Sequence, residues 1–178
     1  QKQIDYMKAN FLHDTHLSSY GDGDWDDTLQ PANPQLKKFM VSSWTVALTY
    51  QVMTHFSALL NQVDKEKAHD LGSLAQNIKA DYQRYMLSTD VIPGFVYMEN
   101  AEEPKLMLHP SDDTTGINYR LLPMTRSMIA ELLTPEEAEQ HLDLIMNKFY
   151  CPDGVRLMDK PAHYKGGVST HFKRAEQA

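Results

Sequence analysis

The longest run of helix-spaced apolar residues lies between residues 34 and 62. Asn33 can cap its first turn, and the proline at position 34 suits the first position of a helix. The apolar residues on one face of this stretch are Leu36, Phe39, Met40, Trp44, Ala47, Leu48, Met53, Phe56, Leu59 and Leu60. Three valines fall outside that face, and a helix that is apolar on more than one side usually packs between others. The pattern therefore predicts one long helix over 34–62, enclosed by neighbouring helices.

Other segments show the same periodicity. Helical spacing marks residues 4–12, 64–86, 119–133 and 134–148. The last of these begins with TPEE, in which Thr134 can cap the helix, Pro135 suits its first turn and Glu137 completes a capping box. STDVIPGFVYMEN and KLMLHP indicate short extended pieces. Paired helices with elaborate loops predict an all-α bundle, toroid or barrel in which the extended pieces form β-hairpin loops.

Composition restricts the class of partner. The 178 residues are 42% hydrophobic and 23% charged, which is typical of one globular domain. A net charge of −7 argues against nucleic acid and anionic membranes as partners. No apolar run approaches the roughly 18 residues of a membrane span. Cys151 is the single cysteine, so an internal disulfide is excluded, which fits a reducing cytoplasm. Because residue 1 opens directly into a helical pattern, we expect a piece of a longer polypeptide with exposed apolar faces.

The segment SSYGDGDWDDTLQP, residues 18–31, places four aspartates within six positions. Neighbouring carboxylates raise the cost of ionising one another, so the segment is either a solvated turn or a site that uses its charge. A calcium loop starting at Asp22 would need glycine at its sixth position and glutamate at its twelfth. This chain has Asp27 and Asn33 there. The EF-hand interpretation therefore fails, and a looser calcium or magnesium site stays open.

Glycoside chemistry uses the same residue types. Cleaving an acetal needs a carboxylic acid that stays protonated near neutral pH, and crowded carboxylates raise one pKa while another group remains ionised. Trp25 offers a flat face for a sugar ring, and Gly21 and Gly23 let the backbone bend toward a ligand. The alternative is a solvated acidic turn with Trp25 folded back into the core.

Two further pairs of residues have candidate chemistry. His13 and His16 could bind a metal, although no third ligand follows at suitable spacing, and surface or packing roles are the alternative. Arg120 and Arg126 could face an anion such as phosphate. Arginines on such a helix more often pair with a carboxylate or cover apolar surface.

GDGDWDD resembles the G-x-G-D-W-N-D signature of the inverting β-glycoside phosphorylases of glycoside hydrolase family 94. That family includes cellobiose, chitobiose and β-oligoglucan phosphorylases. TPEEAEQHLDLIMNKFYCPDGVRLMD is similar to the family's helix, turn and G-[IV]-R-L-[LM]-D segment. DWDDTLQP, RLMDKP and YKGG resemble bacterial relatives described as glycosyltransferase 36 or cellobiose phosphorylase-like. The resemblance spans most of the chain and implies a fragment, residues 1–178, of one (α/α)6-barrel catalytic domain whose flanking parts lie elsewhere.

The resemblance also implies site residues. The aspartate that closes the family's D-W-N-D motif is its general acid, and the matching residue is Asp27. Trp25 matches the motif's tryptophan, and Asp26 stands where the family has asparagine, which makes it a rival for the proton. Tyr164 in HYKGG and Glu176 in RAEQA match residues near the acceptor and phosphate sites, although the local sequence differs. The donor-sugar residues and most phosphate ligands of the family would fall outside this chain.

The implied reaction is reversible phosphorolysis of a β-glucoside, an oligosaccharide or disaccharide, with inversion to α-glucose 1-phosphate. Asp27 would protonate the glycosidic oxygen while inorganic phosphate, a co-substrate, attacks the opposite face of the anomeric carbon; no cofactor or metal is implied. An inverting hydrolase of the same fold would need a second carboxylate roughly 6.5–9.5 Å from the acid. A non-catalytic carbohydrate-binding helical domain would need neither. The linkage stays open, as does a homodimer of the full-length protein.

Overall fold

The computed structural model describes residues 1–23, 29–113 and 115–160, and about half of these residues are helical. The helices are α1 (Lys2–Ala9), α2 (Pro34–Phe39), α3 (Ser43–Leu60), α4 (Lys65–Tyr85), α5 (Leu121–Ile129) and α6 (Pro135–Lys148). The strands are β1 (Met40–Ser42), β2 (Phe95–Tyr97), β3 (Lys105–Met107), β4 (Tyr150–Cys151) and β5 (Gly154–Val155). The prediction of a largely helical chain is confirmed.

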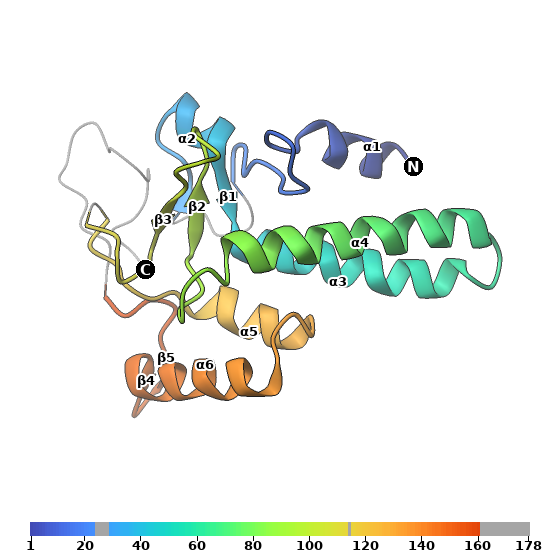
Figure 1. The fold of residues 1–178 in the computed structure, drawn as a ribbon. Coiled ribbons are helices and arrows are strands. Elements are labelled where there is room, and N and C mark those ends of the chain that lie inside the picture. The colour runs from blue at the N-terminus through green and yellow to red at the C-terminus, as the bar shows by residue number, and fades with distance from the viewer. Residues whose placement is uncertain (24–28, 114, 161–178) are drawn as a thin grey trace.

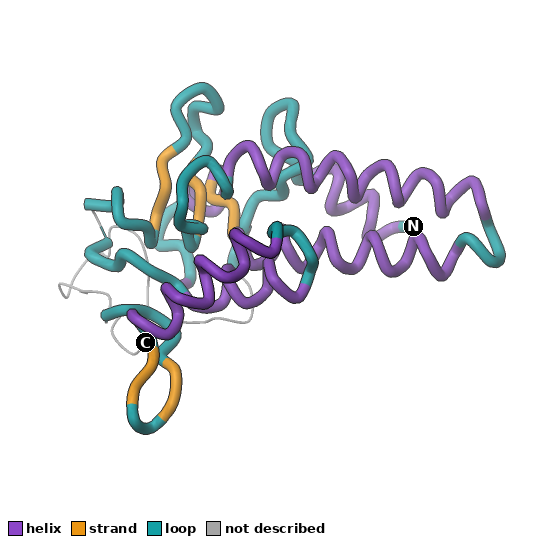
Figure 2. Tube along the Cα trace, turned by 60° about the horizontal axis from the view of Figure 1, so that its bottom comes forward, coloured by secondary structure: helices purple, strands orange, loops and turns teal. Residues whose placement is uncertain are grey.

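Helices α3 and α4 lie side by side as the longest pair, with α1 along one side and α5 and α6 on the other (Figure 1). An antiparallel sheet of order β1-β2-β3 lies with α2 at the end of the pair where α3 begins. The β4–β5 hairpin projects from the end of α6 (Figure 2). Across the three described ranges, no helix combines the length and apolar character needed to cross a membrane.

The prediction of one continuous helix over 34–62 is wrong. Residues 40–42 leave the helical path and pair with β2, in the register Met40 to Tyr97 and Ser42 to Phe95. The helix then restarts because the Ser42 hydroxyl accepts a hydrogen bond from the Thr45 N–H at 3.3 Å, as an N-cap. All three strand residues are buried, although only Met40 belonged to the predicted apolar face. The pairing partner lies more than fifty residues away, which helical spacing cannot reveal.

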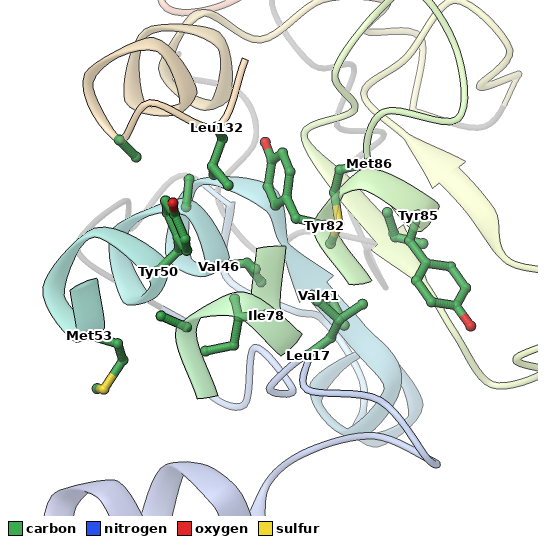
Figure 3. Close-up of a cluster of buried hydrophobic side chains, with 14 of the residues drawn as sticks. Leu17, Val41, Val46, Tyr50, Met53, Ile78, Tyr82, Tyr85, Met86 and Leu132 are labelled. Carbon is green, nitrogen blue, oxygen red and sulfur yellow. The ribbon is translucent and has the colours of Figure 1, made fainter. Parts of the chain in front are cut away.

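The buried face of α3 also differs from the predicted one. Val46 is buried although it lay outside that face, whereas Phe56 and Leu59 are 43% and 67% exposed. The buried side chains point at α4, where Ile78 and Tyr82 are fully enclosed (Figure 3). The expected exposed apolar face is thus present, at the end of α3 far from the sheet.

A buried polar contact joins this helix pair to α5. The Tyr82 hydroxyl lies 2.6 Å from the Ser127 hydroxyl, which itself donates to the Pro123 carbonyl at 2.6 Å. Tyr82 therefore donates to Ser127. Burial raises the pKa of Tyr82, which keeps this donor protonated.

The remaining elements follow the sequence more closely. The helix predicted over 64–86 is α4, and the one predicted over 119–133 is the shorter α5. The capping box of α6 is present: the Thr134 hydroxyl accepts from the Glu137 N–H at 3.2 Å, and the Glu137 carboxylate accepts from the Thr134 N–H at 2.8 Å. The predicted extended pieces are β2 and β3.

Candidate active site at the acidic segment

The five residues to which the sequence assigns site roles lie outside the described residues. Asp27, Trp25 and Asp26 fall within 24–28, and Tyr164 and Glu176 fall within 161–178. The described residues nevertheless show which hydrogen bonds and which buried apolar residues hold both ends of the acidic segment.

The chain enters the acidic segment against α2. The N–H groups of Tyr20 and Gly21 donate to the carbonyl oxygens of Met40, at 2.7 Å, and Lys37, at 3.0 Å. The Lys37 ammonium also forms an ion pair with the carboxylate of Asp22. The first of the four aspartates is therefore engaged by α2.

Two glycines shape this entry. Gly21 has a φ of 63° and Gly23 a φ of 117°, values that residues with a side chain rarely adopt. The Gly23 N–H closes a turn by donating to the Tyr20 carbonyl at 3.2 Å. The prediction that these glycines let the backbone bend is confirmed.

The chain leaves the acidic segment through a buried leucine. Leu29 is fully buried in an apolar group that we call the sheet cluster: Tyr20, Leu29, Leu36, Met40, Phe95, Met107, Leu108, Ile117 and Met158. The Asn33 side chain then accepts from the Leu36 N–H at 2.9 Å, which confirms the predicted cap of α2. Because Tyr20 precedes the four aspartates of the segment and Leu29 follows them, the chain on both sides of the aspartates is buried in the same cluster.

The second motif reaches the same cluster from the other end of the sequence. Met158, within RLMD, is buried in the sheet cluster beside residues from the first motif's flanks. Asp159 fixes this segment, because its Oδ1 accepts from the N–H groups of Asn118 and Tyr119, each at 3.0 Å. The residues that flank the first motif and the second motif are therefore brought together by the fold.

Both arginines considered as anion contacts lie against aromatic rings. Arg120 is 1% exposed, and its guanidinium carbon lies 5.0 Å from the centre of the Phe95 ring. Arg126 lies 5.5 Å from the centre of the Trp44 ring and donates to the side-chain Oε1 of Gln51 at 3.0 Å. These geometries match the packing role that was the alternative to phosphate contact.

A buried aspartate that sequence reasoning missed organises the loop after β3. Asp112 is 8% exposed and accepts from the Leu108 N–H at 2.8 Å and from the Thr115 hydroxyl at 2.6 Å. The first of these bonds engages the N–H of Leu108, whose φ is 52°. The run SDDTT was the available signal, because aspartate and threonine side chains commonly bond to backbone within a turn.

His109 ties this loop to the connection after α4. Its Nδ1 accepts from the Ser111 N–H at 3.1 Å, so Nε2 carries the proton and donates to the Thr89 hydroxyl at 2.9 Å. Burial lowers the pKa of His109, and the charge of Asp112 opposes that shift. The ring is a neutral structural bridge.

The histidine pair considered for metal binding is used otherwise. His16 Nδ1 lies 2.9 Å from the Asp81 carboxylate, whereas His13 Nε2 lies 2.5 Å from the Met98 carbonyl oxygen. Among the described residues, no three histidine, cysteine or acidic side chains converge on a common point.

Comparison with known proteins agrees with the resemblance. No family model matches the chain. It is similar to a 1,2-β-oligoglucan phosphorylase of Listeria innocua serovar 6a, with 56% identity over 173 residues, or 97% of this chain. The chain spans 16% of that protein's length. The chain is therefore a relative of a β-glycoside phosphorylase.

Proposed function

We propose that this chain is part of the (α/α)6-barrel catalytic domain of an inverting β-glycoside phosphorylase. The observation that carries the proposal is the 56% identity to an oligoglucan phosphorylase over 97% of the chain. The substrate is a β-glucan oligosaccharide, of β-1,2 linkage as in the relative's name, together with inorganic phosphate. The products are α-glucose 1-phosphate and a glucan shortened by one unit. The complete protein is cytoplasmic and works without a cofactor, and it forms a homodimer.

Asp27 is the general acid of this mechanism. Its proton passes to the glycosidic oxygen as the bond from that oxygen to the anomeric carbon breaks, and a phosphate oxygen bonds to the opposite face of the carbon. In the synthetic direction the Asp27 carboxylate takes the proton back from the acceptor hydroxyl. Phosphate replaces the water and second carboxylate that an inverting hydrolase requires.

The neighbouring residues support this step. Trp25 stacks on a sugar ring, Asp26 influences the protonation of Asp27, and Tyr164 and Glu176 line the acceptor and phosphate sides. The support from the structure is that the flanks of the first motif, Tyr20 and Leu29, and Met158 of the second motif are buried in the same sheet cluster. Gly21 and Gly23 give the entry to the segment its shape.

Phosphate dependence tests the proposal. The complete protein is incubated with β-1,2-linked glucan oligosaccharides, with and without inorganic phosphate, and products are followed by ³¹P and ¹H NMR. We expect glucose 1-phosphate in the α configuration, formed only when phosphate is present. Release of glucose at equal rates without phosphate would identify a hydrolase, and no turnover of any β-glucoside would reject both enzymatic assignments.

A further inference from the structure

The described residues line a pocket of about 620 Å³, open to solvent, between α2, the edge strand β3 and the loop 111–113. Ligand sites commonly measure about 300–1,000 Å³. Its floor includes Leu36 and Met107, which are 6% and 4% exposed. Both belong to the sheet cluster, which also buries Leu29, so the floor of the pocket and the end of the acidic segment share one apolar cluster.

The walls of the pocket carry mixed polar groups beside an aromatic ring. Gln35 contributes an amide, Lys105 an ammonium and Asp113 a carboxylate, and all three side chains are exposed. Tyr97 is half-buried, and its hydroxyl donates to the Glu99 carboxylate at 2.7 Å. This contact fixes the hydroxyl while the ring borders the pocket.

This chemistry suits a neutral polyhydroxylated ligand. A sugar ring presents hydroxyls that both donate and accept, together with an apolar face that packs against aromatic and aliphatic carbon. The single ammonium of Lys105 shares the lining with two carboxylates, Asp112 and Asp113, so the pocket does not select for an anion.

The position of the pocket relates it to the candidate acid. Asn33, on its rim, follows Asp27 by six residues, and six residues span at most about 20 Å when fully extended. We propose that this pocket, which we call the β3 pocket, is a distal subsite for glucosyl units of the oligosaccharide. This inference rests on the proposed function, because phosphorolysis that removes one terminal unit leaves the rest of the chain on the acceptor side.

The test uses the complete protein and glucan oligosaccharides that differ by one unit. The double variant Gln35→Ala/Lys105→Ala removes two exposed polar contacts from the pocket, and Gln62→Ala/Lys65→Ala is the matched control at the α3–α4 turn. Each net hydrogen bond contributes about 0.5–1.5 kcal/mol. We therefore expect a loss of about tenfold in kcat/KM, through KM, for long oligosaccharides only. The shortest accepted substrate should stay within about twofold of wild type, as should the control with all substrates.

If the double variant has the same kinetics as wild type at every chain length, the subsite is overturned and phosphorolysis is left intact. This result is expected when another part of the polypeptide covers the pocket. An equal loss at every length would also overturn it. If the wild-type protein shows no phosphorolysis, the proposed function fails, and calorimetric titration with the longest oligosaccharide decides the pocket separately. Binding that weakens in the double variant but not in the control supports the subsite, and any other result rejects it.

Discussion

The α3–α4 helix pair and the small sheet are held together in different ways. Between the helices, the buried contacts are mostly apolar, with Val46, Ile78 and Leu74 enclosed along their shared face. Around the sheet, single polar side chains fix the chain at residues with unusual φ values. Asp112, for example, accepts a hydrogen bond from the N–H of Leu108, whose φ is 52°. Apolar packing tolerates exchange between residues of similar volume, whereas a turn held by one carboxylate does not. The acidic segment is attached to the second kind of region.

The largest expected effect lies within the acidic segment. In the complete protein, Asp27→Asn keeps the side chain's size and removes the proton donor, so phosphorolysis should fall by about 10²–10⁴-fold. Asp26→Asn restores the family's usual residue and should cost less than about tenfold. Steady-state rates with one β-glucan substrate measure both variants, and circular dichroism confirms that each is folded.

An aryl glycoside with a low leaving-group pKa sharpens this result. Its departure needs less protonation, so Asp27→Asn should recover much of its rate with this substrate. If Asp26→Asn is inactive and Asp27→Asn is active, the general acid is Asp26 and not Asp27. Two active variants would remove the catalytic role from the segment.

A smaller effect, on stability, is expected when one glycine in each region is replaced by alanine. A Cβ on Gly94, the residue before β2, would lie 2.7 Å from the Leu108 Cβ, so Gly94→Ala forces the backbone segments at 94 and 108 apart. Such overpacking typically costs about 1–3 kcal/mol. In α4, a Cβ on Gly72 meets only the Ser57 hydroxyl, at 3.1 Å, and alanine gains up to about 1 kcal/mol of helix propensity.

Urea unfolding of both variants measures this contrast. We expect Gly94→Ala to lower the free energy of unfolding clearly and Gly72→Ala to stay within about 1 kcal/mol of wild type. Equal losses in both variants would show that the sheet region packs no more tightly around its backbone than the helix pair does.

The smallest effect concerns pH. Burial lowers the pKa of His109 below the ordinary value of 6.5. As the pH falls through that value, His109 is therefore protonated in the unfolded chain while it stays neutral in the folded chain. The stability that the neutral ring contributes is complete above that ordinary value and declines as the pH falls through it. Protonation also removes the acceptor for the Ser111 N–H.

Thermal unfolding between pH 7.5 and 5 measures this decline. The melting temperature of His109→Gln should depend less on pH than that of wild type, whereas His55→Gln, at an exposed position on α3, should follow wild type. Identical pH profiles for all three proteins would assign His109 no part in the pH dependence.

The sequence predicts where helices α2 and α6 begin better than it predicts the sheet, because the signals differ in range. Capping residues such as Asn33 and Thr134 act within four residues, so their patterns could be interpreted directly. The strand at 40–42 depends on a partner at 95–97, and its apolar residues fit a helix equally well. For the candidate site, the glycine turns could be predicted from residue type, and the bonds of Asp112 are equally local. The pocket beside β3 depends instead on distant segments meeting.

The burial of Leu29 with Met158 has a consequence for synthesis of the protein. The two residues are separated by 129 positions (158 − 29) in the sequence. Contacts between distant residues form late, since the intervening chain must be available first. The acidic segment leaves the ribosome before residue 158 does, so it obtains its apolar contact with Met158 only after that residue has followed. Meanwhile the α3–α4 pair, whose contacts are local, can already form. A nascent chain arrested before residue 158 would therefore carry a folded helix pair and an acidic segment without part of its anchor.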